Sequence, residues 1–454
     1  MLDIVELEVL KQGKLCVRTL SPYPKPRTLE GGDIMNRVIY RVVGEFAHFL
    51  NTASGEILTF EINEKDAEFL MTYKGNQEAD LTEDTVEFFN EQGQANTRLC
   101  RTHLANLGME FSFPTMVNLE LNRRCLLCCL HCYLGKESVE SRAPSFIEQM
   151  SKKEIVAFFE RLKRMGVFLI VLTGGEPFLN TKMEFLVETI SRMGFVFEIF
   201  SNLQMIPEWF RTIDPTDTRI GRIQTSVYSS DSKVHDQVTT KEGSWSKTMG
   251  NLLWLKKHGF YVEVATPLMT LNFDSHGQTR DYFERLNIRQ DFSWPIVNEY
   301  YSVKTDKSSL NISPEQFRNF CIENPQFLIR IEFVDSNEPI CEAGKALFSI
   351  NAEGIVQPCS QLPVSVGNIL ISTIDDIYRS REMEFYREMR CSNVERDYVY
   401  CFCPGNNYSE TGDLFTQPSF VREAISAFER RKEVNGHEEV HTHQECQHSK
   451  VRWC

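Results

Sequence analysis

Three cysteines spaced as C-x3-C-x2-C, namely Cys125, Cys129 and Cys132, are the side chains with the clearest chemical potential in this sequence. Four thiolates normally hold a [4Fe–4S] cluster. A cluster held by only three leaves one iron open to a further molecule, so this spacing predicts chemistry at the metal. Cys128 adds a second interpretation, because four thiolates in this stretch could also surround a zinc ion.

A second motif favours the iron–sulfur interpretation. Residues 167–173 form a short apolar run that is typical of a buried strand, and Gly174-Gly175-Glu176-Pro177 follow it directly. The two glycines allow a backbone edge to approach a ligand closely, the carboxylate can bind an ammonium group, and the proline ends the strand. This motif supplies a use for an open iron.

The two motifs together resemble those of the radical S-adenosylmethionine (SAM) superfamily. The resemblance implies that the iron bound by the three cysteines holds the amino and carboxylate groups of SAM, with Cys128 as a non-ligand. It also implies that His131 lies near the adenine and that polar residues after two later strands bind the ribose. An electron entering the cluster would cleave SAM to methionine and a 5′-deoxyadenosyl radical, which abstracts hydrogen from the substrate. The cofactor-binding residues expected are His131, Gly174, Gly175, Glu176, Pro177, Asn202 and Ser226.

Alternating strand and helix patterns over residues 113–300 predict parallel βαβ units. This fold class is α/β, a partial (β/α)6 TIM-like barrel, with the cysteine loop and Glu176 at the carboxyl ends of strands, where barrel enzymes carry their chemistry. Ser151 is expected to cap the first helix, and His235 with Asp236 to fix a loop. Strands are expected at 116–121, 167–173, 196–200, 220–227 and 261–266, and further helices at about 183–193, 245–258 and 278–286.

The segment 1–105 differs from the rest of the chain in the order of its expected strands and helices, and this order predicts a small α+β domain. Its expected strands are followed by helices, an order that resembles the winged recognition domains of peptide-modifying enzymes. Such domains bind a leader peptide as an added strand; a simple capping subdomain is the alternative. The expected strands cover 37–43, 47–50 and 57–62, and the expected helices 64–74 and 82–92.

Cysteines return beyond residue 340. Cys341, Gly354 and Cys359 are spaced as C-x12-G-x4-C, which resembles the opening of the SPASM domain and implies an auxiliary [4Fe–4S] cluster within residues 301–430. Val394 stands where another cysteine of that domain is expected, and zinc is the alternative metal. Residues 431–454 are rich in His and Cys and could bind a metal or form a solvated tail. The candidate ligands, enough for one four-thiolate cluster, are Cys341, Cys359, Cys391, Cys401 and Cys403.

The composition argues against some classes of binding partner. The chain of 454 residues carries a formal charge of −14, which argues against binding to nucleic acid or anionic membranes. No apolar run reaches about 18 residues, so no membrane span is expected. The acidic start of the sequence lacks a secretory signal, and its 14 cysteines fit metal ligation in a reducing cytoplasm.

These observations lead to one main hypothesis. The chain is expected to be a radical SAM maturase that acts on a ribosomally made precursor peptide, with electrons from a donor such as flavodoxin or ferredoxin. The product would carry a thioether or carbon–carbon cross-link, or an epimerised residue. An anaerobic sulfatase-type protein maturase is the second interpretation. A non-catalytic iron–sulfur or zinc scaffold that binds peptide is the third, and it leaves residues 174–177 without a purpose.

Overall fold

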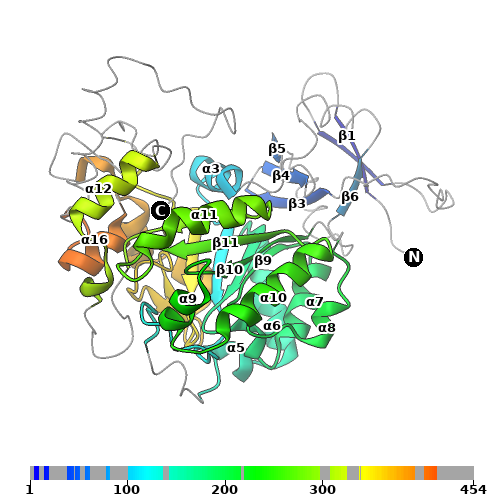
Figure 1. Cartoon of the computed structure of the whole chain (residues 1–454). Helices are drawn as coiled ribbons and strands as arrows, with labels where there is room; N and C mark the ends of the chain where they lie inside the picture. Colours follow the sequence, from blue (N-terminus) through cyan, green and yellow to red (C-terminus); the bar gives the residue numbers. More distant parts are fainter. Residues whose placement is uncertain are drawn as a thin grey trace.

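The structure, a computed structural model, is built around one large sheet flanked by a smaller sheet near the N-terminus (Figure 1). Among the described residues the large sheet has nine strands, in the order β12-β11-β10-β9-β8-β7-β13-β14-β15. The structure describes residues 5–9, 15–19, 38–44, 46–51, 57–61, 78–81, 101–135, 143–215, 219–296, 307–324, 337, 339–393 and 403–416.

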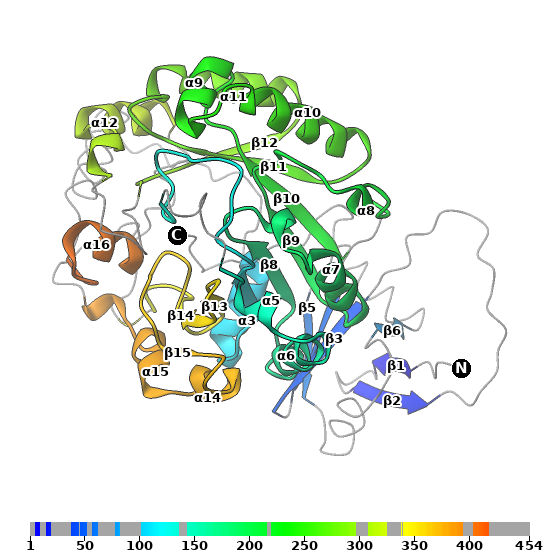
Figure 2. The same cartoon turned by 90° about the horizontal axis from the view of Figure 1, so that it is seen from below.

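Six neighbouring strands of the large sheet run parallel and form the partial barrel. Helices lie on its convex side (Figure 2), as right-handed crossovers between parallel strands require. The predicted α/β partial barrel is therefore confirmed. The strands are β7 (Met116–Glu120), β8 (Leu169–Thr173), β9 (Val196–Phe200), β10 (Ile220–Ser226), β11 (Val262–Pro267) and β12 (Arg289–Ser293).

The helix that precedes β8 shows how local sequence determines an element. Helix α6 (Lys152–Arg164) begins at Ser151, whose hydroxyl accepts a hydrogen bond from Glu154 N while the Glu154 carboxylate accepts one from Ser151 N. Its apolar face, which includes Phe159, is buried in the main core. Other helices are α5 (Phe146–Gln149), α7 (Met183–Arg192), α8 (Glu208–Arg211), α9 (Ser232–Thr239), α10 (Ser244–Lys257), α11 (His276–Arg285) and α12 (Pro314–Glu323).

The smaller sheet contains the three N-terminal strands that the sequence predicts and three that it does not. Its order among the described residues is β2-β1-β6-β3-β4-β5. The helices expected at 64–74 and 82–92 lie outside the described residues. The strands are β1 (Val5–Val9), β2 (Leu15–Thr19), β3 (Val38–Val43), β4 (Phe46–Asn51), β5 (Ile57–Glu61) and β6 (Glu78–Leu81).

A buried arginine fastens the smaller sheet to the barrel. Arg41 on β3 donates hydrogen bonds to Val167 O (2.7 Å) and Gly194 O (2.9 Å), which precede β8 and β9. Its guanidinium lies against the rings of Phe168 and Phe195. Burial lowers the pKa of Arg41 to about 9, so it remains charged at neutral pH. The amino ends of two barrel strands therefore fix the position of the smaller sheet.

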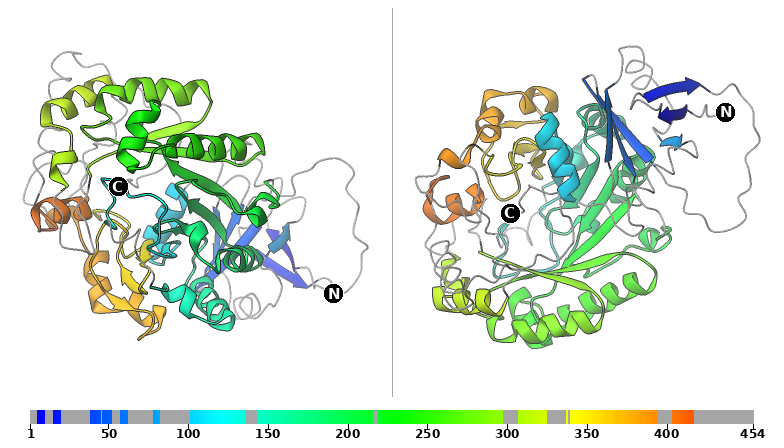
Figure 3. Two further views of the ribbon diagram at one scale, coloured as in Figure 1. Left: turned by 60° about the horizontal axis from the view of Figure 1, so that its bottom comes forward. Right: turned by 90° about the horizontal axis from the view of Figure 1, so that it is seen from above.

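Helix α3 (Arg101–Phe111) lies between the smaller sheet and the C-terminal region (Figure 3). Its Leu104 and Leu107 pack in one core with residues of β3 and β8. A Cβ atom added at Gly108 would lie only 2.5 Å from Ala346 Cβ, so this helix also approaches the C-terminal region closely. We therefore regard α3 as part of the barrel body.

The C-terminal region continues the barrel sheet. Strand β13 (Leu347–Ile350) pairs parallel with β7, and β14 (Ile355–Gln357) and β15 (Gly367–Asn368) follow it as antiparallel neighbours. Because β14 runs antiparallel to β13 and β7, Cys359, two residues after β14, lies toward the amino end of β7, whereas the cysteine loop follows the carboxyl end of that strand. The remaining helices of this region are α14 (Ile374–Tyr378), α15 (Arg381–Arg387) and α16 (Pro404–Thr411).

Four short 3-10 turns complete the described elements: η1 (Pro177–Leu179), η2 (Phe273–Ser275), η3 (Ser308–Leu310) and η4 (Cys391–Asn393). Among the helices of the described residues, none has both the length and the apolar character needed to cross a membrane. The expected domain boundaries at 105, 113, 300 and 430 stay predictions.

Candidate active site

The two glycines after β8 bring this strand end against the chain that leads into the cysteine loop. Gly175 N donates to Asn122 O at 2.8 Å, and Glu176 N donates to Arg124 O at 2.7 Å. A Cβ atom at Gly175 would lie 2.2 Å from Arg124 O, and one at Gly174 would lie 2.4 Å from Asn122 O. In this structure the close approach that these glycines allow is therefore to the base of the cysteine loop.

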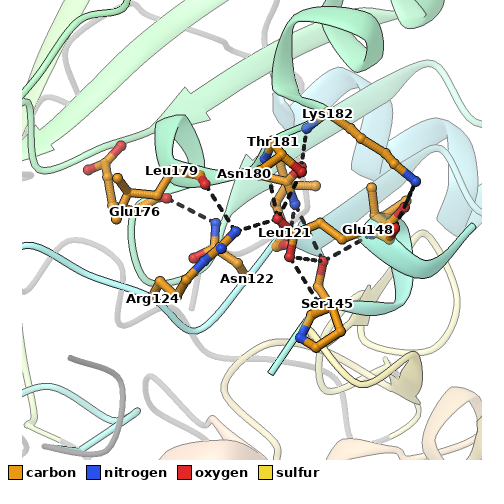
Figure 4. A network of polar contacts seen from close by, with 12 residues as sticks. Leu121, Asn122, Arg124, Ser145, Glu148, Glu176, Leu179, Asn180, Thr181 and Lys182 are labelled. Carbon is orange, nitrogen blue, oxygen red and sulfur yellow. Dashed lines mark hydrogen bonds and ion pairs between the residues drawn. The ribbon is translucent and has the colours of Figure 1, made fainter. Parts of the chain in front are cut away.

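A network of polar contacts fixes the same base from the other side (Figure 4). Asn122 Nδ2 donates to Glu176 O at 3.0 Å, and Asn180 Nδ2 donates to Leu121 O at 2.6 Å. Arg124 forms an ion pair with Glu148 and also donates to a backbone carbonyl of η1. The loop thus starts from a framework held by side-chain and backbone hydrogen bonds.

Glu176 connects this framework to the next strand end. Its buried carboxylate accepts hydrogen bonds from Ser201 Oγ (2.8 Å), Asn202 N (2.9 Å) and Phe178 N (3.1 Å). Burial raises the pKa of Glu176 to about 7, although these three donors favour the charged form. The side chain therefore orients residues 201–202 after β9.

All three loop cysteines face hydrogen-bond donors. Asn202 Nδ2 lies 3.3 Å from Cys125 Sγ, and Leu127 N lies 3.4 Å from the same atom. The Tyr228 hydroxyl lies 3.6 Å from Cys129 Sγ. Backbone N–H groups after Cys132 lower its pKa against the larger effect of burial. Donors aimed at sulfur stabilise a thiolate, the form that binds metal.

The electrostatics of these thiols fit a cluster. Burial raises the pKa of Cys125 to about 12 and also raises that of Cys129 and Cys132. The charge of Cys132 also raises the pKa of Cys125, and the charges of Cys132 and Cys125 raise the pKa of Cys129. The three thiols therefore lie near one another. A positively charged iron–sulfur core would supply the charge that buried thiolates need. Among the described residues, no three His, Cys, Asp or Glu side chains are placed to hold a single metal ion.

His131 and Ser226 both lie beside Tyr228. The His131 ring meets the Tyr228 ring edge to face at a centroid distance of 5.0 Å. Burial lowers the pKa of His131 to about 4, so the imidazole is neutral at physiological pH, and its Nδ1 has no hydrogen-bond partner among the described residues. A hydrogen bond from Ser226 lowers the pKa of the Tyr228 hydroxyl against the larger, opposing effect of burial. Their roles toward SAM stay predictions.

His235 and Asp236 lie on α9, next to the loop rather than in it. His235 Nδ1 is 3.3 Å from Tyr228 N. The Asp236 carboxylate accepts hydrogen bonds from Gly243 N (2.7 Å) and Trp245 N (2.8 Å) at the start of α10. This arrangement is what a loop-fixing role requires.

The second cysteine site brings together Cys341, Cys359 and Cys403. The charges of Cys359 and Cys403 raise the pKa of Cys341, although burial is the largest cause and Glu342 the next. Gly405 lies close to the turn after Cys359, since a Cβ atom there would be 2.5 Å from Gln361 O. Cys391 lies in η4, but its side chain, together with Cys401 and the tail 431–454, is outside the described residues.

Two segments of the chain match known domain families. Residues 119–286 match the radical SAM superfamily, and residues 341–405 match the SPASM iron–sulfur cluster-binding domain. The chain therefore carries a radical SAM domain and a SPASM domain. It is therefore an enzyme whose cofactors are SAM and [4Fe–4S] clusters, and the residues at 125–132 and 174–177 lie within the matched segment.

Curated relatives differ in what they make. The chain is 27% identical over 331 residues to the antilisterial bacteriocin subtilosin biosynthesis protein AlbA of Bacillus subtilis, covering 69% of this chain and 71% of AlbA. It is 20% identical to an AdoMet-dependent heme synthase of Methanosarcina barkeri, over 68% of this chain and 96% of the relative.

Solved structures support the same fold. SuiB of Streptococcus suis bound to S-adenosylmethionine aligns with a TM-score of 0.57 at 16% identity, covering 85% of this chain and 98% of SuiB. The enzyme anSMEcpe with bound AdoMet and a peptide aligns at 0.52 and 14% identity, covering 70% of this chain and 96% of anSMEcpe. At these identities the likeness is one of fold alone.

Sequence reasoning missed several contacts of this radical SAM site. Tyr228 lies two residues after Ser226, yet nothing in its sequence neighbourhood indicates contact with Cys129. The Arg124–Glu148 ion pair joins the segment after β7 to α5. Both contacts depend on tertiary packing, which periodicity does not reveal.

Proposed function

We propose that this enzyme modifies a ribosomally made precursor peptide. The observation that carries the proposal is the combination of a radical SAM barrel, a SPASM domain and an N-terminal sheet in one chain. The chain is similar to AlbA, which is named for subtilosin biosynthesis, and 85% of the chain aligns with SuiB, whose structure has been solved bound to its precursor peptide SuiA.

The residues of the barrel prepare the site for one kind of chemistry. When bound, the cluster and SAM supply a 5′-deoxyadenosyl radical that removes hydrogen from a substrate C–H bond. The loop residues Cys125, Cys129 and Cys132 would hold the cluster, and Gly174 to Pro177 would lie along the methionine part of SAM. Asn202 and Ser226 would bind the ribose, and the neutral His131 would lie near the adenine.

The smaller sheet is suited to binding the leader of the peptide. Within the described residues its order ends at β2 on one side and β5 on the other, so two strands have one unpaired edge each. An extended peptide can add to such an edge through backbone hydrogen bonds. Because Arg41 fixes the sheet to the barrel, a peptide bound there would be held at a constant distance from the active site.

The product is a cross-linked or epimerised peptide, and the electron donor is a small redox protein such as flavodoxin or ferredoxin. A sulfatase-type maturase remains the second candidate, because 70% of this chain aligns with the structure of anSMEcpe with bound AdoMet and a peptide. That alternative gives no role to the N-terminal sheet. The third interpretation, a scaffold without catalysis, does not fit the match of residues 119–286 to the radical SAM family.

Mass spectrometry of the cognate precursor peptide after anaerobic turnover tests the proposal. A loss of two hydrogens indicates a cross-link, and an unchanged mass with deuterium uptake from solvent indicates epimerisation. Formation of 5′-deoxyadenosine without any change in the peptide would contradict a peptide substrate.

Removal of residues 1–100 tests the role of the sheet and keeps α3, whose Leu104 and Leu107 also pack with residues of β8 in the barrel. The shortened enzyme should still cleave SAM, which shows that the barrel is folded. It should bind a fluorescently labelled leader peptide much more weakly in an anisotropy titration. Unchanged affinity would remove the recognition role.

A further inference from the structure

Two lysines hold the cysteine loop from outside the three-cysteine motif. Lys241, just after α9, donates to Leu126 O at 3.0 Å. Lys307, at the start of the segment that leads into α12, donates to Leu130 O at 2.8 Å. These two carbonyls flank Cys128 and Cys129, so the charged groups reach the loop between its ligand positions. Neither lysine belongs to a motif that the sequence analysis identified.

The end of α9 adds uncharged contacts to the same loop. Leu130 N donates to Val238 O at 2.9 Å, and Cys128 N donates to Thr239 O at 3.3 Å. The Thr240 hydroxyl donates to Cys128 O at 2.9 Å. Asp236 holds this turn against the start of α10. The loop is thus fixed by backbone and hydroxyl bonds even without the lysine charges.

The charge of Lys307 affects the pKa values of two residues of the cysteine loop. It lowers the pKa of Cys132 and of His131, although burial is the larger influence on both. Both lysines are only partly exposed, so water screens their charges incompletely. Reduction adds one negative charge to a cluster that three thiolates already make negative, and nearby cations favour the reduced form. Net charge and hydrogen bonding around a cluster are known determinants of its reduction potential.

We propose that Lys241 and Lys307 are positioning residues whose charges raise the reduction potential of the SAM-binding cluster and so ease entry of the electron. One electron from the external donor reduces the cluster, and no proton or bond changes at either lysine. This role concerns the cluster alone and does not depend on which substrate the enzyme modifies.

The experiment is an EPR-monitored redox titration of the reconstituted full-length enzyme. The signal of the SAM-binding cluster is recognised because it changes when SAM is added. Lys241→Gln and Lys307→Gln keep an amide donor for the carbonyl but remove the charge, and each should shift the midpoint potential to a more negative value. The double variant should shift it further. Lys241→Arg and Lys307→Arg keep the charge and should stay close to the wild-type potential.

Thr240→Val is the matched neutral control, because it removes a hydrogen bond to the same loop without changing any charge. Its potential should lie near that of the wild type. Iron and sulfide counts show whether each variant retains its clusters. Fully loaded Gln variants with unchanged potentials would overturn the proposal. An equal shift in Thr240→Val would also overturn the proposal, as would a loss of cluster in the Gln variants that the Arg variants do not restore. Each of these results would mean that the lysines only support the fold of the loop and do not act through their charge.

Discussion

The two cysteine sites of this molecule share backbone donors to sulfur from nearby residues and differ in the side-chain donors that come from residues far away in sequence. At both, backbone N–H groups that follow a cysteine by two or three residues act on its sulfur. At the first site, Asn202 and Tyr228 add side-chain donors from the ends of β9 and β10. The local donors arise from the turn itself, whereas the distant donors exist only because the barrel brings separate strand ends together.

This difference indicates that the surroundings of the two clusters are built in different ways. Sulfur-directed hydrogen bonds and nearby charges set the properties of a cluster. The barrel can therefore adjust the first cluster through residues far away in sequence, including Lys241 and Lys307. Within the described residues, the backbone donors to Cys341 and Cys359 at the second site come from the turns that follow these cysteines.

Removal of the ligands should give the largest difference between the sites. Replacing Cys125, Cys129 and Cys132 by Ala should abolish formation of 5′-deoxyadenosine and remove one cluster, about four of about eight irons. Replacing Cys341, Cys359 and Cys403 by Ala should remove the other cluster and spare SAM cleavage, because the first site is built on the barrel. Iron and sulfide counting with product chromatography measures both.

Cys128→Ala is the control for this comparison, since Cys128 lies in the same loop and is predicted not to bind the cluster. Its iron content and SAM cleavage should match the wild type. A loss of one cluster in this variant would restore the four-thiolate interpretation of the loop, and an unchanged iron count in the Cys125/Cys129/Cys132 variant would refute the assignment.

Glycine substitutions test how tightly each site is packed. A Cβ at Gly175 would meet Arg124 O at 2.2 Å, and one at Gly405 would meet Gln361 O at 2.5 Å. Both neighbours are backbone, which cannot move aside easily. Gly175→Ala and Gly405→Ala should each lower the free energy of unfolding by about 1–3 kcal/mol or more, and each should reduce the iron content of its own site.

Gly250→Ala provides a matched control, because nothing lies within 4 Å of the added Cβ and the residue is exposed within α10. This variant should be unchanged or more stable by about 0.5–1 kcal/mol, since alanine favours a helix over glycine. Urea unfolding under anaerobic conditions measures all three proteins. Iron loss from the wrong site, or no loss at all, would break the proposed link between packing and each cluster.

The sequence predicted the strands around the first site because their apolar runs are a local signal. Apolar runs such as 167–173 identify barrel strands, and the structure confirms β8 and β9 within two residues of the predicted limits. Strand β12 was missed because its sequence, RQDFS, alternates in exposure and has few apolar residues. Strand β13 has only four residues and is stabilised by pairing with β7.

The contacts that tune the first site had no sequence signal. Tyr228, Lys241 and Lys307 act on a loop about 100 to 180 residues away, and each of these contacts exists only in the folded barrel. The same reason applies to Arg41, which looks like an ordinary strand residue until the barrel buries it. Spacing rules describe ligands; tertiary packing determines what surrounds them.

Glu120 lies between the two sites and should make stability depend on pH. It accepts a hydrogen bond from Tyr133 beside the first site, at 2.9 Å, and lies near the Ala352 backbone of the C-terminal region. Burial raises its pKa from 4.5 to about 7. The folded state therefore binds this proton more tightly than the unfolded state, so the associated stability is present below pH 4.5 and is lost as the pH rises to about 7.

Glu120→Gln removes this titration and keeps an acceptor for Tyr133. Between pH 5.5 and 8 the wild type should lose about 2 kcal/mol of unfolding free energy relative to the variant. Parallel urea titrations at the two pH values measure the difference. Identical pH dependence in the two proteins would show that the junction of the two sites does not hold a proton at Glu120.

The smallest effect should come from Tyr228→Phe, which removes a single hydroxyl donor 3.6 Å from Cys129 Sγ. Loss of a donor to sulfur destabilises the reduced cluster, so the midpoint potential of the SAM-binding cluster should become slightly more negative. The potential of the auxiliary cluster should not change, because no described donor of that site is altered. Tyr282→Phe on α11 serves as the control for loss of a tyrosine hydroxyl elsewhere in the barrel. An equal shift at both clusters would mean that Tyr228 acts on the whole protein, and the contrast between a barrel-tuned site and a locally built one would then fail.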